Sequence, residues 1–200
     1  MRRPFPWALL RLTLLLVTLL SGGAGIAQEN NKNKKVSDVD RVAQAYAQLV
    51  GARTEVLNYA LALQRKYDPR TEEYSRGRDL YVDATKSWAE WSAMVVVAVE
   101  AGHAKNLNND IYRSKALDAG KKTQMFLDYV EEKTAAPRGG FVDFATKLIN
   151  IGLDIYNGTR SKQPDDRKSM ADKFDAQGTK WPLWDEMSQA KKDDGQQKKD

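Results

Sequence analysis

The sequence predicts an all-α protein: a bundle of four to five helices that begins with a long N-terminal antiparallel helical hairpin. Apolar residues between positions 39 and 99 recur every three or four positions in two long runs, which is the period of an amphipathic helix. Turn signals, such as Asp68-Pro69 and residues 137–140, divide the chain into pieces of helical length. The chain has no cysteine, so its core must form without disulfides.

The first helix is predicted to begin after Ser37 and to end before Pro69. Ser37 stands three residues before Asp40, which is a weak capping-box pattern, and Asp68 is disfavoured in a helix because a proline follows it. One continuous apolar stripe, interrupted only by Arg53, runs between these limits. The stripe consists of Val39, Val42, Tyr46, Leu49, Arg53, Val56, Ala60, Leu63 and Tyr67.

The second helix is predicted to start near Thr71 and to end at Gly102. Glu72 and Glu73 suit the first turn of a helix, and glycine is the usual residue just after its last turn. Residues 93–99 are apolar on every face, and their β-branched valines would also suit a buried strand. Helix is favoured, because the stripe of the preceding residues runs into this segment without a turn signal.

Three shorter helices are predicted downstream. One covers about residues 107–134, after asparagines that suit a helix N-cap. The next covers residues 141–156 and is apolar on all but one narrow face. The last is a polar helix at residues 164–178 that opens with proline and aspartates and closes with glycine.

Residues 1–27 are predicted to be a cleavable secretory signal peptide. They contain three arginines, then the apolar run 12–20, and then small residues up to Ala27, in the order expected of such a leader. A membrane-spanning helix needs about 20 apolar residues, so an uncleaved anchor is the less favoured alternative. We expect a flexible polar spacer at 28–37, a single helical domain at 38–188 and a disordered hydrophilic tail at 189–200. The expected location is the bacterial periplasm or the exterior.

Charge and cysteine content argue against several function classes. The whole chain has 32 basic and 27 acidic residues, a net charge of +5. Without the three arginines of the leader, 29 basic and 27 acidic residues remain, and residues 38–188 carry 22 basic and 23 acidic residues. A near-neutral domain argues against nucleic-acid binding, which needs a concentrated basic face. The absence of cysteine excludes thiolate metal sites and cysteine nucleophiles.

Trp181 and Trp184 flank Pro182 near the end of the predicted domain. Tryptophan is a favoured anchor at protein interfaces, so this pair is a candidate binding site. The alternative is that both rings cover one end of the bundle core, and the two interpretations are nearly balanced. Trp88 and Trp91 lie on the stripe of the second helix and are predicted to be core residues.

Arg53 and a polar line on the helix predicted at 141–156 are further candidate binding residues. Arg53 is a candidate to hold an anionic ligand, although a packed stem with a paired or solvated head is favoured. Asp143, Lys147, Asn150 and Asp154 step by fours and threes along one side of the apolar helix. They are candidates to line a cleft, but a solvated edge of a buried helix is the favoured interpretation.

His103 is the only histidine, and with Glu100 it forms one Glu-x-x-His half-motif of the kind that di-iron bundles use twice. The second copy is missing, and Gly102 places the pair at a predicted helix end, where a histidine interacts favourably with the helix dipole. The sequence contains no phosphate-binding glycine loop and no nucleophile elbow. We therefore predict no metal site, no cofactor and no catalytic residue.

These observations favour an exported, non-catalytic protein that binds another envelope or secreted protein, as an assembly or secretion accessory or as an inhibitor or immunity-type protein. The alternative is a carboxylate-dependent periplasmic hydrolase of cell-wall glycan, in which Asp143 or Asp154 would work with Glu90 or Glu100. Membrane contact through residues 141–156 ranks last, because this segment lacks the lysine and arginine enrichment of interfacial helices.

Overall fold

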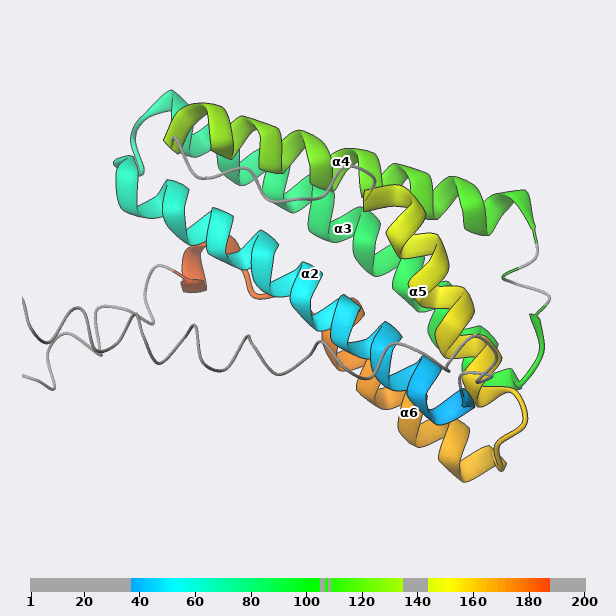
Figure 1. Cartoon of the computed structure of the whole chain (residues 1–200). Helices are drawn as coiled ribbons and strands as arrows, with labels where there is room; N and C mark the ends of the chain where they lie inside the picture. The colour runs from blue at the N-terminus through cyan, green and yellow to red at the C-terminus, as the bar shows by residue number, and fades with distance from the viewer. Residues whose placement is uncertain (1–36, 105–106, 108, 135–143, 188–200) are drawn as a thin grey trace, which may run out of the picture. The chain divides into compact units, whose positions relative to one another are not determined.

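The computed structural model describes residues 37–104, 107, 109–134 and 144–187. Within these ranges the chain forms five long helices, a helical turn at residues 184–187, and no strand (Figure 1). The helices are α2 (Asp38–Lys66), α3 (Glu72–Ala101), α4 (Asp110–Thr134), α5 (Phe144–Thr159) and α6 (Pro164–Gly178). The predicted all-α bundle is confirmed, and residues 93–99 are helical. The predicted leader, most of the spacer and the predicted tail lie outside the described residues.

The helix boundaries follow the capping signals of the sequence. The Ser37 hydroxyl accepts a hydrogen bond from the backbone N–H of Asp40 at 3.1 Å, and the Thr71 hydroxyl accepts one from Tyr74 at 3.3 Å. Each bond satisfies one of the N–H groups that the first turn of a helix leaves unpaired. Gly102 ends α3 with a φ of 67°, a left-handed conformation that favours glycine.

Some of the main helix pairs join helices that are not adjacent in the chain. Figure 1 shows α3 and α4 side by side, and this is the most extensive helix pair of the described chain. The helix α2 packs mainly against α5, and α6 packs mainly against α3. A short turn joins α2 to α3, but their contact with each other is smaller than the contact that each makes with a later helix. The predicted N-terminal hairpin is therefore not confirmed as a packing unit.

Aromatic side chains fill the centre of the bundle. Trp88 and Trp91 are both buried, and their rings meet edge to face with centroids 5.8 Å apart. Phe174 of α6 packs on Trp91 in the same manner, and Phe126 of α4 packs on Tyr81 of α3. Edge-to-face pairs add a modest stabilisation to the burial of their apolar area. The prediction that Trp88 and Trp91 are core residues is confirmed.

The helices α4 and α5 meet in close contact at Gly120. A Cβ atom at this position would lie 2.5 Å from Cα and 2.6 Å from the backbone N of Ala145. Backbone atoms in a packed helix cannot move aside as the end of a flexible side chain can. The helix α5 can therefore take this position only because the residue at position 120 is a glycine, which has no side chain.

Candidate functional site

An apolar groove of about 520 Å³ lies between the N-terminal half of α2, the C-terminal end of α5, and α6. Its volume falls within the range of about 300–1,000 Å³ that is typical of small binding sites. The helix α2 contributes Val39, Val42, Ala43 and Tyr46 to its wall. These positions are i, i+3, i+4 and i+7, so they form one stripe on the surface of the helix.

The groove forms because α5 and α6 do not fully cover the start of the α2 stripe. Val42 is buried against α5, where Gly158 lets the two backbones approach closely: a Cβ on Gly158 would lie 2.7 Å from the carbonyl oxygen of Asp38. One turn away, Val39 remains 63% exposed. On the opposite wall, Phe174 of α6 is buried. The bundle therefore leaves Val39 and Ala43 of the α2 stripe exposed, while it buries Val42.

Two lysines give the groove its charge. Lys162 lies just after α5 and Lys173 lies on α6, and both line the groove, whose described lining residues include no carboxylate. Neither ammonium group forms an ion pair in the described part of the chain. The groove thus combines an apolar floor with two positive charges that are available to a ligand.

The candidate anchors Trp181 and Trp184 lie elsewhere, against the core. Trp184 is only 3% exposed, and its ring centroid is 5.3 Å from that of Tyr81 and 5.5 Å from that of Tyr74. Trp181 is half-buried and packs edge to face on Trp88, with centroids 5.0 Å apart. The structure therefore places the pair as the alternative interpretation describes it, as a cover over one end of the core.

Arg53 holds this part of the chain in place. Its guanidinium donates hydrogen bonds to the Gln177 side-chain oxygen at 2.6 Å and to the Lys180 carbonyl at 2.7 Å, and it lies over the Trp181 ring at 5.5 Å. We call residues 179–187 the C-terminal strap. The two terminal nitrogens of Arg53 thus donate to the strap and to the end of α6.

Two further side chains bind carbonyl groups of the C-terminal strap. Gln64 of α2 donates to the Trp184 carbonyl at 2.6 Å, and Tyr81 of α3 donates to the Pro182 carbonyl at 2.9 Å. Burial raises the pKa of the Tyr81 hydroxyl, with the charge of Arg53 opposing the shift, so the hydroxyl stays a donor at physiological pH. The strap, whose regular structure is limited to one helical turn, is thereby fixed by side chains from two helices.

Replacing Arg53 with methionine is expected to lower the free energy of unfolding by about 1.5–2 kcal/mol, because the methionine keeps an apolar stem but leaves the strap carbonyls without their charged donor. Urea unfolding followed by tryptophan fluorescence measures the change. Arg65→Met is the control, since Arg65 is an exposed arginine of the same helix, and its effect should stay within about 0.5 kcal/mol. Equal midpoints for the two variants would contradict the structural role of Arg53.

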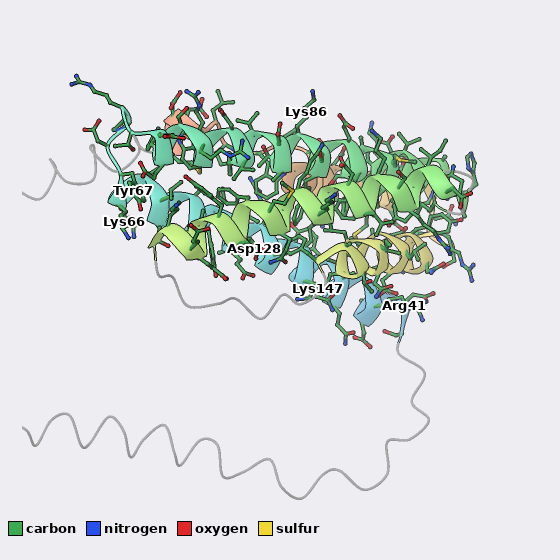
Figure 2. All side chains as sticks on the ribbon, turned by 90° about the horizontal axis from the view of Figure 1, so that it is seen from above. Arg41, Lys66, Tyr67, Lys86, Asp128 and Lys147 are labelled. Carbon is green, nitrogen blue, oxygen red and sulfur yellow. The ribbon has the colours of Figure 1, made fainter. Side chains whose placement is uncertain are left out.

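The predicted polar line joins α5 to α2. Asp154 lies 4.0 Å from the Arg41 guanidinium, and both side chains are partly exposed. Lys147 acts on Glu55 of α2: burial raises the pKa of the Glu55 carboxyl, and the positive charge of Lys147 opposes this shift. Figure 2 shows Arg41 and Lys147 along the same side of the bundle. The described part of the line is thus a partly solvated seam, and Asp143 lies outside the described residues.

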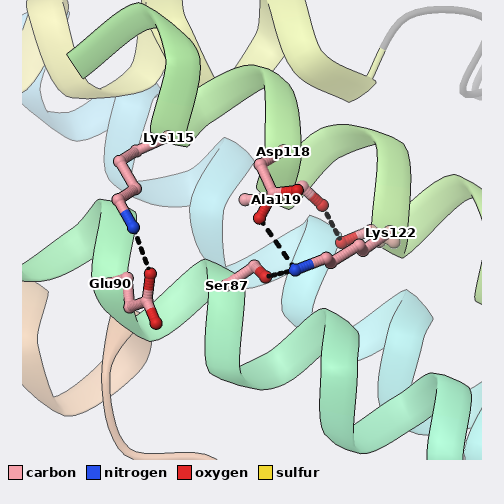
Figure 3. A network of polar contacts seen from close by, with 7 residues as sticks. Ser87, Glu90, Lys115, Asp118, Ala119 and Lys122 are labelled. Carbon is pink, nitrogen blue, oxygen red and sulfur yellow. Dashed lines mark hydrogen bonds and ion pairs between the residues drawn. The ribbon is translucent and has the colours of Figure 1, made fainter. Parts of the chain in front are cut away.

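A polar network ties α3 to α4 (Figure 3). The Lys122 ammonium donates to the Ser87 hydroxyl at 2.8 Å and lies 2.9 Å from a carboxylate oxygen of Asp118. Burial opposes ionisation of Asp118, but hydrogen bonds from Lys122 and Ser87 outweigh it and lower the pKa of this carboxyl. The network is suited to holding two helices together.

Of the carboxylates considered for a hydrolase, the structure describes Glu90, Glu100 and Asp154. Glu90 is exposed, and a hydrogen bond and the charge of Lys115 lower its pKa, whereas a general acid needs a raised pKa. Glu100 is exposed at the end of α3, and His103 is exposed as well. Among the described residues, no three histidines or carboxylates gather as a metal site would require. The described groups therefore give the hydrolase interpretation no support.

The apolar side of α5 is used inside the bundle. Leu148, Ile151 and Ile155 are buried, so this face is not presented as the membrane-contact hypothesis requires. None of the helices in the described ranges is long and apolar enough to cross a membrane.

Sequence reasoning did not identify the groove. Val39 and Val42 both belong to the predicted apolar stripe of the first helix, but the structure buries Val42 and exposes Val39. The only available signal was that the stripe extends to the second residue of its helix. A scan against protein-family models and searches of curated proteins and of solved structures found no match to this chain.

Proposed function

We propose that this chain is an exported, non-catalytic helical protein that acts by binding another envelope or secreted protein. The observation that carries the proposal is the open groove between α2, α5 and α6, which joins an apolar floor to two unpaired lysines. Proteins commonly receive an amphipathic helix of a partner in a groove of this kind, with anchor residues spaced at i, i+3, i+4 and i+7. The α2 stripe from Val39 to Tyr46 gives one wall of the groove helical spacing, against which a second helix can pack.

Support for export comes from the sequence. Residues 1–27 combine positive charge, a short apolar run and small residues in the order of a signal peptide. The rest of the chain has no cysteine, so it has no thiol that an oxidising compartment would pair wrongly. The proposed location is the periplasm or the exterior of a bacterium.

Capture from an envelope extract tests both parts of the proposal. The full chain is expressed with its leader in a bacterial host, and the mass of the exported product should correspond to a chain that starts near Gln28. A native partner should be retained by this product and by the Ile111→Asp variant, and lost with Val39→Asp. Val39 and Ile111 are a matched pair: each is the second residue of its helix and 63% exposed, but only Val39 lines the groove.

An aspartate in the first turn interacts favourably with the helix dipole, so neither variant should unfold. Far-UV circular dichroism checks this point. Equal retention of the partner by the two variants would show that the groove is not the binding surface. An uncleaved product would contradict the signal peptide and favour an anchor.

A further inference from the structure

We propose that the groove receives an acidic amphipathic helix, in which carboxylates flank an apolar face. This inference rests on the proposed function, because it states the chemistry of the partner at the same groove. Three features of the groove support it: the spacing of its apolar residues, the small side chain at its centre, and its charge.

The apolar residues indicate the shape of the occupant. Val39, Val42, Ala43 and Tyr46 extend over eight residues of α2, which is about 10 Å along the helix axis. An apolar stripe with helical spacing packs best against a second helix, whose side chains interdigitate with it. Ala43 is exposed in the middle of this stripe, and its small side chain allows a second backbone to approach closely. These features favour a helix over a chain without regular structure.

The charges of the groove indicate the charge of the helix that binds there. Lys162 and Lys173 come from different elements, and both line the groove. Among the residues that the structure describes, the groove lining supplies no carboxylate that would neutralise either charge. A basic partner helix would meet two like charges, whereas an acidic one would form ion pairs with both. Complementary charge of this kind fixes the choice and the orientation of a partner more than it adds to affinity.

Two synthetic peptides of about 18 residues test the inference directly. Both carry leucines at i, i+3, i+4 and i+7, and they differ only in the flanking residues, which are glutamates in one and lysines in the other. They are titrated by calorimetry into the exported full chain at low salt. The glutamate peptide is expected to bind about tenfold more tightly than the lysine peptide, and this preference should diminish as salt is added.

Variants of the full chain locate the binding site. Lys173→Glu should weaken binding of the glutamate peptide and strengthen binding of the lysine peptide. Lys168→Glu should change the affinity for neither peptide. Both lysines are exposed on α6, but only Lys173 lines the groove. Val39→Asp should weaken binding of both peptides, and Ile111→Asp should weaken binding of neither.

The outcomes separate the inference from the proposed function. Equal binding of the two peptides, lost in Val39→Asp, would overturn the acidic partner and keep the groove as a helix-binding site. No peptide binding would overturn the inference, and if Val39→Asp also left native capture unchanged, the proposed function would fall with it. If vesicles of anionic lipid bound in a manner that depended on Val39 and Lys173, and neither peptide bound, the occupant would be a lipid and the inference would be overturned.

Discussion

Replacing Trp184 with alanine is expected to lower the free energy of unfolding by about 3–5 kcal/mol, because a ring that is 3% exposed leaves a cavity that its neighbours cannot fill. The ring packs against Tyr74, Tyr81 and Phe126, so its loss removes contacts with both α3 and α4. A loss of this size is a large part of the stability of a typical domain. Urea unfolding followed by circular dichroism measures it.

Leu183→Ala is the matched control for this prediction. Leu183 precedes Trp184 in the same C-terminal strap, but its side chain is 66% exposed. Its replacement should change stability by no more than about 0.5 kcal/mol. If Trp184→Ala were as stable as Leu183→Ala and instead lost its partner, Trp184 would be an interface anchor and its placement in the core would be wrong.

Replacing Gly120 with alanine is expected to lower the free energy of unfolding by about 3 kcal/mol. The new Cβ atom would lie 2.5 Å from the Ala145 backbone, so α4 and α5 would have to separate. Alanine is about 1 kcal/mol better than glycine within a helix, so the local preference acts against the expected result. The direction of the change therefore reports on packing between helices and not on helix propensity.

Gly51→Ala serves as the control for Gly120→Ala. Gly51 lies within α2, and a Cβ added there would meet nothing within 4 Å. This variant should gain about 0.5–1 kcal/mol, which is the ordinary benefit of alanine in an exposed helix. Thermal unfolding of the two variants should shift in opposite directions. Stabilisation by both would mean that α4 and α5 are not in close contact at Gly120.

Local chemistry made the helix limits predictable. Ser37, Thr71 and Gly102 act through their own side chains or backbone conformation, so their roles can be recognised without knowing what packs nearby. The core positions of Trp88 and Trp91 followed from the period of the stripe in the same way.

The pairing of the helices and the groove were not predictable in this manner. An apolar stripe shows which face of a helix needs a partner, but not which helix supplies it. The stripes of α2 and α3 match each other, yet the structure satisfies them mainly with α5 and α4. Val39 and Leu49 look alike in the stripe, and only the placement of α5 and α6 leaves Val39 exposed while Leu49 is buried.

The candidate site residues illustrate the same limit. Arg53 in an apolar stripe indicates a special role, but the partner it finds lies 124 residues further along the chain, at Gln177. Trp181 and Trp184 resemble interface anchors because exposed and buried tryptophans in a loop have the same sequence pattern. The sequence did not distinguish Lys162 and Lys173 as site residues, since lysine is common on any solvated surface.

The C-terminal strap determines when the molecule can finish folding. Trp184 completes the aromatic contacts of Tyr74 and Tyr81, and it is among the last described residues of the chain. A secretion channel that passes the chain from its N-terminus would release this residue after the five helices. Until then the core lacks one of its largest rings, so the chain has less tendency to collapse into a form too compact to be threaded. The late position of the strap would thus confine folding to the compartment in which the protein is proposed to act.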